Sequence, residues 1–270
     1  MLLLVSLYIV VEIISGLFTG SLALIADAGH MLADAGGLAL ALFAINFSSK
    51  PATPQRTYGF YRIEILAALA NGAVLILVSV YIIYNAYGHI IEPREIESIP
   101  MMAVAGIGLA VNLIGMKLLK VHAKENLNME GAYLEVLKDT LGSVSVVVVG
   151  VIIFSTKFYL ADPIISVGLA FYILPRTWTL MKKSINILME GVPMNISYEE
   201  VKKAILQIKG VTGVFDIHIW TITSGMDAIT AHVVVSDPSK SQTILKEISS
   251  MLEKRFKITH TTIQIETYHT

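Results

Sequence analysis

Apolar residues fill six long stretches of the first 190 positions, and polar residues gather mainly in the gaps between them. A membrane-spanning helix needs about 20 mostly apolar residues, so each stretch is a candidate span. The first stretch contains Glu12 and lacks the basic start and small-residue cleavage site of a signal peptide, so we interpret it as a span too. The pattern predicts six transmembrane helices, at residues 2–19, 22–45, 62–88, 99–119, 131–155 and 161–181.

Residues 191–270 follow a different pattern, in which apolar and polar positions alternate over short distances. Ser197 and Glu200 form a capping box that predicts a helix to about Ile208. The following periodicity predicts a strand at 214–223, a turn at Ser224 and Gly225, a strand at 228–235, a helix from about Ser239 to Arg255, and a strand at 261–267. The order αββαβ is typical of a small α+β domain, a sheet with helices on one face.

Charge divides the chain at the same place. Residues 1–190 carry 12 Lys/Arg and 13 Asp/Glu, whereas the much shorter remainder carries eight of each. A soluble domain carries roughly a quarter charged residues, so only residues 191–270 resemble one. The net charge of −1 argues against a nucleic-acid partner, and the absence of cysteine excludes disulfides and thiolate metal sites. We therefore expect a membrane domain at 1–190 and a water-soluble domain at 191–270.

The loops between the predicted spans differ in basic residues. Cytoplasmic loops of membrane proteins carry an excess of Lys and Arg. Basic residues follow the second, fourth and sixth spans: Lys50, Arg56, Arg62, Lys117, Lys120, Lys124, Lys182 and Lys183. The other loops contain only Arg94, beside acidic residues, and Lys157. This bias places both chain termini and the soluble domain in the cytoplasm.

Ionisable residues inside two of the spans share one spacing. His30 and Asp34 in the second span, and Glu135 and Asp139 in the fifth, are each four positions apart and so lie on one helix face. Two such pairs supply four ligands, enough for a tetrahedral metal shell. Taken singly, each pair is equally explained by an interhelical hydrogen bond or, for Glu135, an ion pair with Lys138. The repeated spacing favours a metal site or a proton path.

Other polar positions in the spans have simpler interpretations. Glu12, Asn71 and Asn112 are expected to form hydrogen bonds between helices. Asp162, which precedes a proline, is expected to cap the helix that it begins.

Several segments together resemble the cation diffusion facilitator family, in particular its bacterial zinc/cobalt/cadmium-resistance branch. These segments are SLALIADAGHMLADA, YGFYRIEILAALANG, NMEGAYLEVLKDTLGSV, ADPIIS, LMEGVP and DIHIWTITSG, and they span nearly the whole chain. The resemblance implies six spans, a cytoplasmic ferredoxin-like domain, a homodimer in the bacterial inner membrane, and proton-coupled export of divalent metal. It also implies a transport site at His30, Asp34, Glu135 and Asp139.

The chain departs from the zinc-type pattern of this family in the fifth span. Glu135 stands where that pattern has a histidine, and Lys138 stands where it has a small residue. Three carboxylates and one imidazole form a harder, more oxygen-rich shell, so Zn, Cd, Co, Mn and Fe are all candidate substrates, with Zn first. We hypothesise that Lys138 partly compensates the extra negative charge of Glu135.

The resemblance also implies a second, regulatory metal in the cytoplasmic domain. The matching candidate ligands are His232, His260 and Glu266, whereas Phe215 replaces a histidine that some relatives carry. His218 and Trp220 share one strand face and are equally consistent with a packed interface. Arg62 and Glu190 match positions that form an ion pair in relatives.

Two other classes of function are compatible with ionisable residues in the membrane. An intramembrane metal hydrolase needs an open coordination position and a free base, which four ligands from two pairs do not leave. A membrane metal sensor needs a signalling feature, and no kinase or nucleotide motif is present. The sequence therefore favours a transporter, which is not an enzyme, over both.

Overall fold

The long apolar stretches fold as helices of 18 to 30 residues in the computed structural model, which describes residues 2–48, 50–122, 127–223 and 225–267. These helices are α1 (Leu2–Thr19), α2 (Leu22–Ser48), α3 (Arg62–Ile91), α4 (Ser98–His122), α5 (Leu127–Thr156) and α6 (Ala161–Leu188). Lys124 and Ser224, which entered the predictions of orientation and of a turn, lie outside the described residues.

Four helices are long and apolar enough to cross a membrane, judged over the described residues. They are α3, α6 and the segments Ser98–Lys120 of α4 and Val136–Thr156 of α5. A shorter apolar segment, Ser6–Thr19, makes up most of α1. The predicted helical membrane domain is confirmed, and several helices continue beyond their apolar core into polar residues, as α6 does past Lys182 and Lys183.

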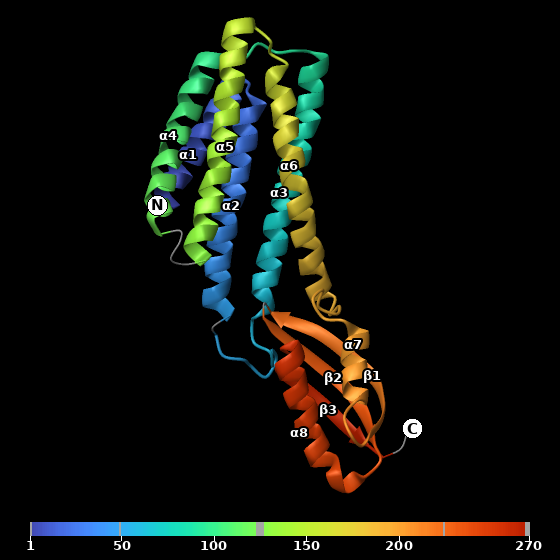
Figure 1. The fold of residues 1–270 in the computed structure, drawn as a ribbon. Coiled ribbons are helices and arrows are strands. Elements are labelled where there is room, and N and C mark those ends of the chain that lie inside the picture. The colour runs from blue at the N-terminus through green and yellow to red at the C-terminus, as the bar shows by residue number, and fades with distance from the viewer. Residues whose placement is uncertain (1, 49, 123–126, 224, 268–270) are drawn as a thin grey trace. The chain divides into compact units, whose positions relative to one another are not determined.

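The chain divides into two compact units. The first contains Met1–Ala39 and Ala70–Thr179, and the second contains Leu40–Leu69 and Leu180–Thr270. In the first unit, α1, α2, α4 and α5 run side by side (Figure 1). Their core includes Leu24 from α2, Met101 from α4 and Val146 from α5, all fully buried or nearly so. A Cβ atom at Gly150 would collide with Met102, so this glycine allows α5 to approach α4 closely.

Asp162 does not cap its own helix, contrary to the sequence-based expectation. Its carboxylate accepts hydrogen bonds from the Ser21 hydroxyl at 2.6 Å and from the backbone amides of Leu22 and Ala23 at 2.8 and 3.2 Å. These amides begin α2, whose first turn has no acceptors of its own within the helix. Asp162, fully buried near the start of α6, therefore caps α2, 140 residues earlier in the chain.

The second unit contains the predicted αββαβ domain, which is confirmed. Its elements are α7 (Tyr198–Leu206), β1 (Val211–Thr223), β2 (Met226–Val235), the 3₁₀ turn η1 (Pro238–Lys240), α8 (Ser241–Met251), the π-helical turn η2 (Leu252–Phe256) and β3 (His260–Glu266). Strand β2 is central, antiparallel to β1 and parallel to β3. Apolar residues of α7, α8 and all three strands form one core, so both helices cover the same face of the sheet (Figure 1).

The second unit also contains two polar contacts made by the start of α3. Arg62 forms an ion pair with Glu190 at 2.8 Å, as the family resemblance implied. Glu64 accepts a hydrogen bond from the hydroxyl of Thr223, the last residue of β1, at 3.0 Å.

Candidate metal site

Three of the four residues that the spacing singled out lie together in the first unit. His30 and Asp34 extend from successive turns of α2, and Asp139 extends from α5. One ligand atom from each of the three lies within 4.8 Å of the other two. All three side chains are partly exposed.

The distances and donor types fit a small divalent cation. His30 Nε2 lies 3.4 Å from Asp34 Oδ2. Tetrahedral coordination at about 2.1 Å from the metal separates neighbouring ligand atoms by about 3.4 Å, so this pair is already spaced for one edge of the shell. The other imidazole nitrogen, Nδ1, is buried and has no hydrogen-bond partner among the described residues.

The fourth predicted ligand, Glu135, belongs to α5 one turn before Asp139. Its side chain lies outside the described residues. The structure thus brings His30, Asp34 and Asp139 together and supplies only the backbone position of Glu135.

A cavity of about 220 Å³ adjoins the site between α2, α5 and α6. Its ionisable lining residues include Asp27, His30 and Lys138, and its apolar wall includes Leu169 and Ile173 of α6. The Lys138 side chain therefore lines the same cavity as a candidate ligand, which the sequence alone did not establish. A positively charged residue thus lies beside the same cavity as His30.

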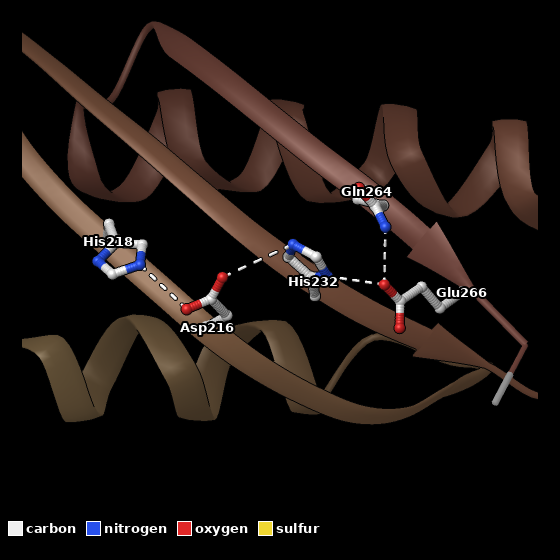
Figure 2. A network of polar contacts seen from close by, with 5 residues as sticks. All are labelled: Asp216, His218, His232, Gln264 and Glu266. Atoms are coloured by element: carbon white, nitrogen blue, oxygen red, sulfur yellow. Dashed lines mark hydrogen bonds and ion pairs between the residues drawn. The ribbon is translucent and has the colours of Figure 1, made fainter. Parts of the chain in front are cut away.

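A second polar cluster occupies the exposed face of the sheet in the second unit, opposite α7 and α8 (Figure 2). Even-numbered residues of β2 and β3 point to this face because side chains alternate along a strand. His232 Nδ1 lies 2.7 Å from Glu266 Oε1, and His232 Nε2 lies 3.7 Å from Asp216 Oδ2. Asp216 also contacts His218 at 3.0 Å, and Gln264 donates a hydrogen bond to Glu266 at 2.8 Å.

The strand register separates the three residues proposed for this domain. His232 pairs with Gln264 across β2 and β3 and reaches the adjacent Glu266, whereas His260 pairs with Ala228 near the far end of β3. His260 therefore lies apart from the cluster, and Asp216 is the additional acidic member. Sequence patterning missed Asp216 because its position depends on a register shift in β1 between Phe215 and His218, where Asp216 has a φ of 51°.

Two family models together match nearly the whole chain. Residues 1–189 match the cation efflux transmembrane domain, and residues 193–268 match the cytoplasmic domain of cation efflux proteins.

Curated relatives are similar over almost the full chain. The metal cation efflux system protein CzcD of Cupriavidus metallidurans is 45% identical over 96% of this chain and 82% of its own length. A cadmium, cobalt and zinc/H⁺–K⁺ antiporter of Bacillus subtilis is 42% identical over 96% and 85%. The zinc transporter ZitB of Escherichia coli is 38% identical over 96% and 83%.

A solved structure, the metal-bound C-terminal domain of the CzcD transporter from Cupriavidus metallidurans, is also similar. It is 42% identical, and the match covers 26% of this chain and 99% of that one, with a TM-score of 0.25.

Replacing either carboxylate of the three-residue cluster should weaken metal binding. We expect Asp34→Asn and Asp139→Asn each to lower the affinity for Zn²⁺ by more than about 100-fold, because loss of a mere supporting partner of a ligand already costs 10–100-fold. Isothermal titration of the purified protein measures this. Asp237→Asn is the matched control, since it removes the same charge from an exposed residue. Hydrogen bonds from Ser239 hold the pKa of Asp237 below its usual value, so this residue is ionised in the assay. Unchanged affinity in both cluster variants would remove them from the site.

Proposed function

The chain belongs to the cation efflux family, and from this membership and its ligand cluster we infer that it exports divalent transition-metal cations from the cytoplasm in exchange for protons. It is a transporter and not an enzyme. The observation that carries the proposal is the convergence of His30, Asp34 and Asp139 within 4.8 Å inside the helical domain. The names of the similar proteins, which include zinc, cadmium and cobalt transport, favour zinc as the first candidate substrate.

We assign the transport site to His30, Asp34, Glu135 and Asp139. The position of Glu135 one helical turn before Asp139 supports its inclusion as the fourth ligand. Three ionised carboxylates and one divalent cation have a net charge of −1. In this proposal the ammonium group of Lys138 balances that charge. The contact of Lys138 with the cavity that His30 lines supports this role.

Proton coupling follows from the chemistry of these ligands. Metal binds to neutral imidazole and ionised carboxylate, so a protonated ligand must release its proton before the cation is held. His30 is one of the ligands at which a proton and the cation compete for the same atom. Protons that enter from the outer side then compete with the metal and promote its release.

The transport cycle requires that the site open to each side of the membrane in turn. We propose alternating access by rocking of the helices that carry the ligands. The loop charges support an orientation with both termini in the cytoplasm of a bacterial cell. Residues 1–190 form the transport domain in this proposal, and residues 191–270 form a cytoplasmic domain that joins two copies of the chain as a homodimer.

We propose a regulatory metal at the exposed face of the cytoplasmic sheet. His232 and Glu266 are two candidate ligands whose atoms already lie 2.7 Å apart. Asp216, whose Oδ2 lies 3.7 Å from the other ring nitrogen of His232, is a third candidate ligand and the second oxygen donor. This set replaces His260, which the register places near Ala228.

Transport in proteoliposomes should depend on a proton gradient. With the lumen acidic, we expect Zn²⁺ uptake that stops when an ionophore collapses the gradient, because luminal protons are then no longer available to displace the metal. A fluorescent zinc indicator in the lumen measures the uptake. Flux of equal size with and without the gradient would contradict the antiport proposal.

The Glu135→His variant should bind zinc more selectively. Replacing an oxygen ligand by a nitrogen ligand makes the shell softer, so the preference for Zn²⁺ over Mn²⁺ should rise. Competition binding of the two metals to the purified protein measures the change.

Lys138→Gly tests the charge balance in the same assay. We expect higher overall affinity and a shifted pH dependence, since a positive charge near the cation is lost. An unchanged affinity and pH profile would show that Lys138 does not compensate the charge of Glu135.

If the cytoplasmic metal site is correctly assigned, His232 and His260 should differ in their effect on metal content. His232→Ala should reduce the number of metal ions bound per chain at saturation, whereas His260→Ala should leave it unchanged, because only His232 contacts two carboxylates. Metal content after equilibrium dialysis gives this number. The assignment is wrong if both variants bind as much metal as the original protein.

A further inference from the structure

A pair of carboxyl groups lies buried in the first unit, apart from the proposed metal ligands. Glu12 of α1 is 0% exposed and Asp27 of α2 is 4% exposed, and the two carboxyl groups interact electrostatically. Neither forms an ion pair with a basic side chain in the described part of the chain. Two neighbouring carboxyl groups that are buried without a basic partner favour a proton on one of them, because two buried negative charges repel each other strongly.

Glu12 has an oxygen atom available for that proton. Its Oε1 accepts a hydrogen bond from the Tyr8 hydroxyl at 3.0 Å. Its Oε2 is buried and receives no hydrogen bond from any described donor. An acceptor that is removed from water and left without a donor is costly. Protonation at this atom replaces an unsatisfied acceptor by a donor.

The neighbouring helices hold Asp27 against Glu12. The Ser143 hydroxyl of α5 donates to Asp27 Oδ2 at 3.4 Å, and Asn112 of α4 donates to that hydroxyl at 3.4 Å. A Cβ atom at Gly142 would lie 2.6 Å from Asp27 Oδ1, so only glycine leaves room for this carboxyl group beside α5. These contacts hold Asp27 on α2, the helix that also carries the candidate ligands His30 and Asp34.

The pair is placed to respond to charge at the metal ligands. Asp27 precedes His30 by one turn of α2, and both line the same cavity, together with Lys138. Asp139 interacts electrostatically with Glu12. The described titratable groups around Glu12 are therefore Tyr8 on its own helix, Asp27 on α2 and Asp139 on α5. From α4, Val104 contributes a carbonyl that accepts from Tyr8, and Asn112 contributes an uncharged amide.

We propose that Glu12, held against Asp27, is a proton-binding residue separate from the metal ligands, which releases its proton when a cation binds. This proposal rests on the proposed metal–proton exchange. A divalent cation adds positive charge near the pair, and positive charge favours loss of the proton. When the cation leaves, the negative charge of Asp139 again favours uptake of a proton by Glu12. The exchange then involves a proton that is carried outside the coordination shell.

The test is the number of protons released per metal bound. Zn²⁺ is added to the purified full-length protein in weakly buffered detergent solution at neutral pH, and the released protons are titrated. Glu12→Gln keeps the size of the side chain and resembles its protonated form. We expect this variant to release about one proton fewer per Zn²⁺ while its affinity changes less than about threefold. Glu199→Gln, the same change at an exposed position of α7, should release as many protons as the original protein.

Infrared difference spectra provide a second measurement in the unsubstituted protein. Addition of Zn²⁺ should remove the C=O stretching band of a protonated carboxyl group, and this loss should be absent in Glu12→Gln. An unchanged proton count in Glu12→Gln, or loss of its Zn²⁺ binding, would overturn the separate role of Glu12 and leave the proposed transport function intact. Zn²⁺ binding to the unsubstituted protein without any proton release would overturn both.

Discussion

The cost of ionisable side chains inside apolar helices governs the arrangement of the first unit. An isolated charge in a span costs at least about 2.5–3.5 kcal/mol, so such residues persist only where other groups satisfy them. Several of the buried or half-buried groups described above interact with a residue of another helix or of their own, although His30 Nδ1 and Glu12 Oε2 have no hydrogen-bond partner among the described residues. Asp162 is satisfied by the amides of another helix, His30 by Asp34, and Glu12 by Tyr8 and Asp27.

The degree of exposure distinguishes two kinds of polar cluster in this unit. The side chains of His30 and Asp34 are 17% and 34% exposed, beside a cavity. Ligands that exchange a hydrated ion need this access, because the ion must lose its water stepwise. Glu12 is fully enclosed, which admits a proton along hydrogen bonds and excludes a metal ion with its shell. The two clusters therefore suit two kinds of ion, and α2 contributes residues to both.

Much of this arrangement was predictable from the sequence, because periodicity and hydropathy act locally. The helix pattern located the spans, and alternation located all three strands within three residues of their observed starts. The i,i+4 spacing brought out His30, Asp34 and Asp139. Long-range geometry was not predictable: Asp162 caps a distant helix, and Asp216 joins His232 only through a register shift in β1. Helix ends were also missed where the backbone pattern continues past the apolar residues, as in α6.

The cap that Asp162 places on α2 has a consequence for biogenesis. A ribosome makes the α1–α2 turn about 140 residues before it makes Asp162. During that interval the first amides of α2 lack the carboxylate that they contact in the finished bundle. The last span thus completes a bond to the first hairpin, and insertion of α6 is coupled to the final seating of α2. A chain truncated before Asp162 would lack these three hydrogen bonds at the start of α2.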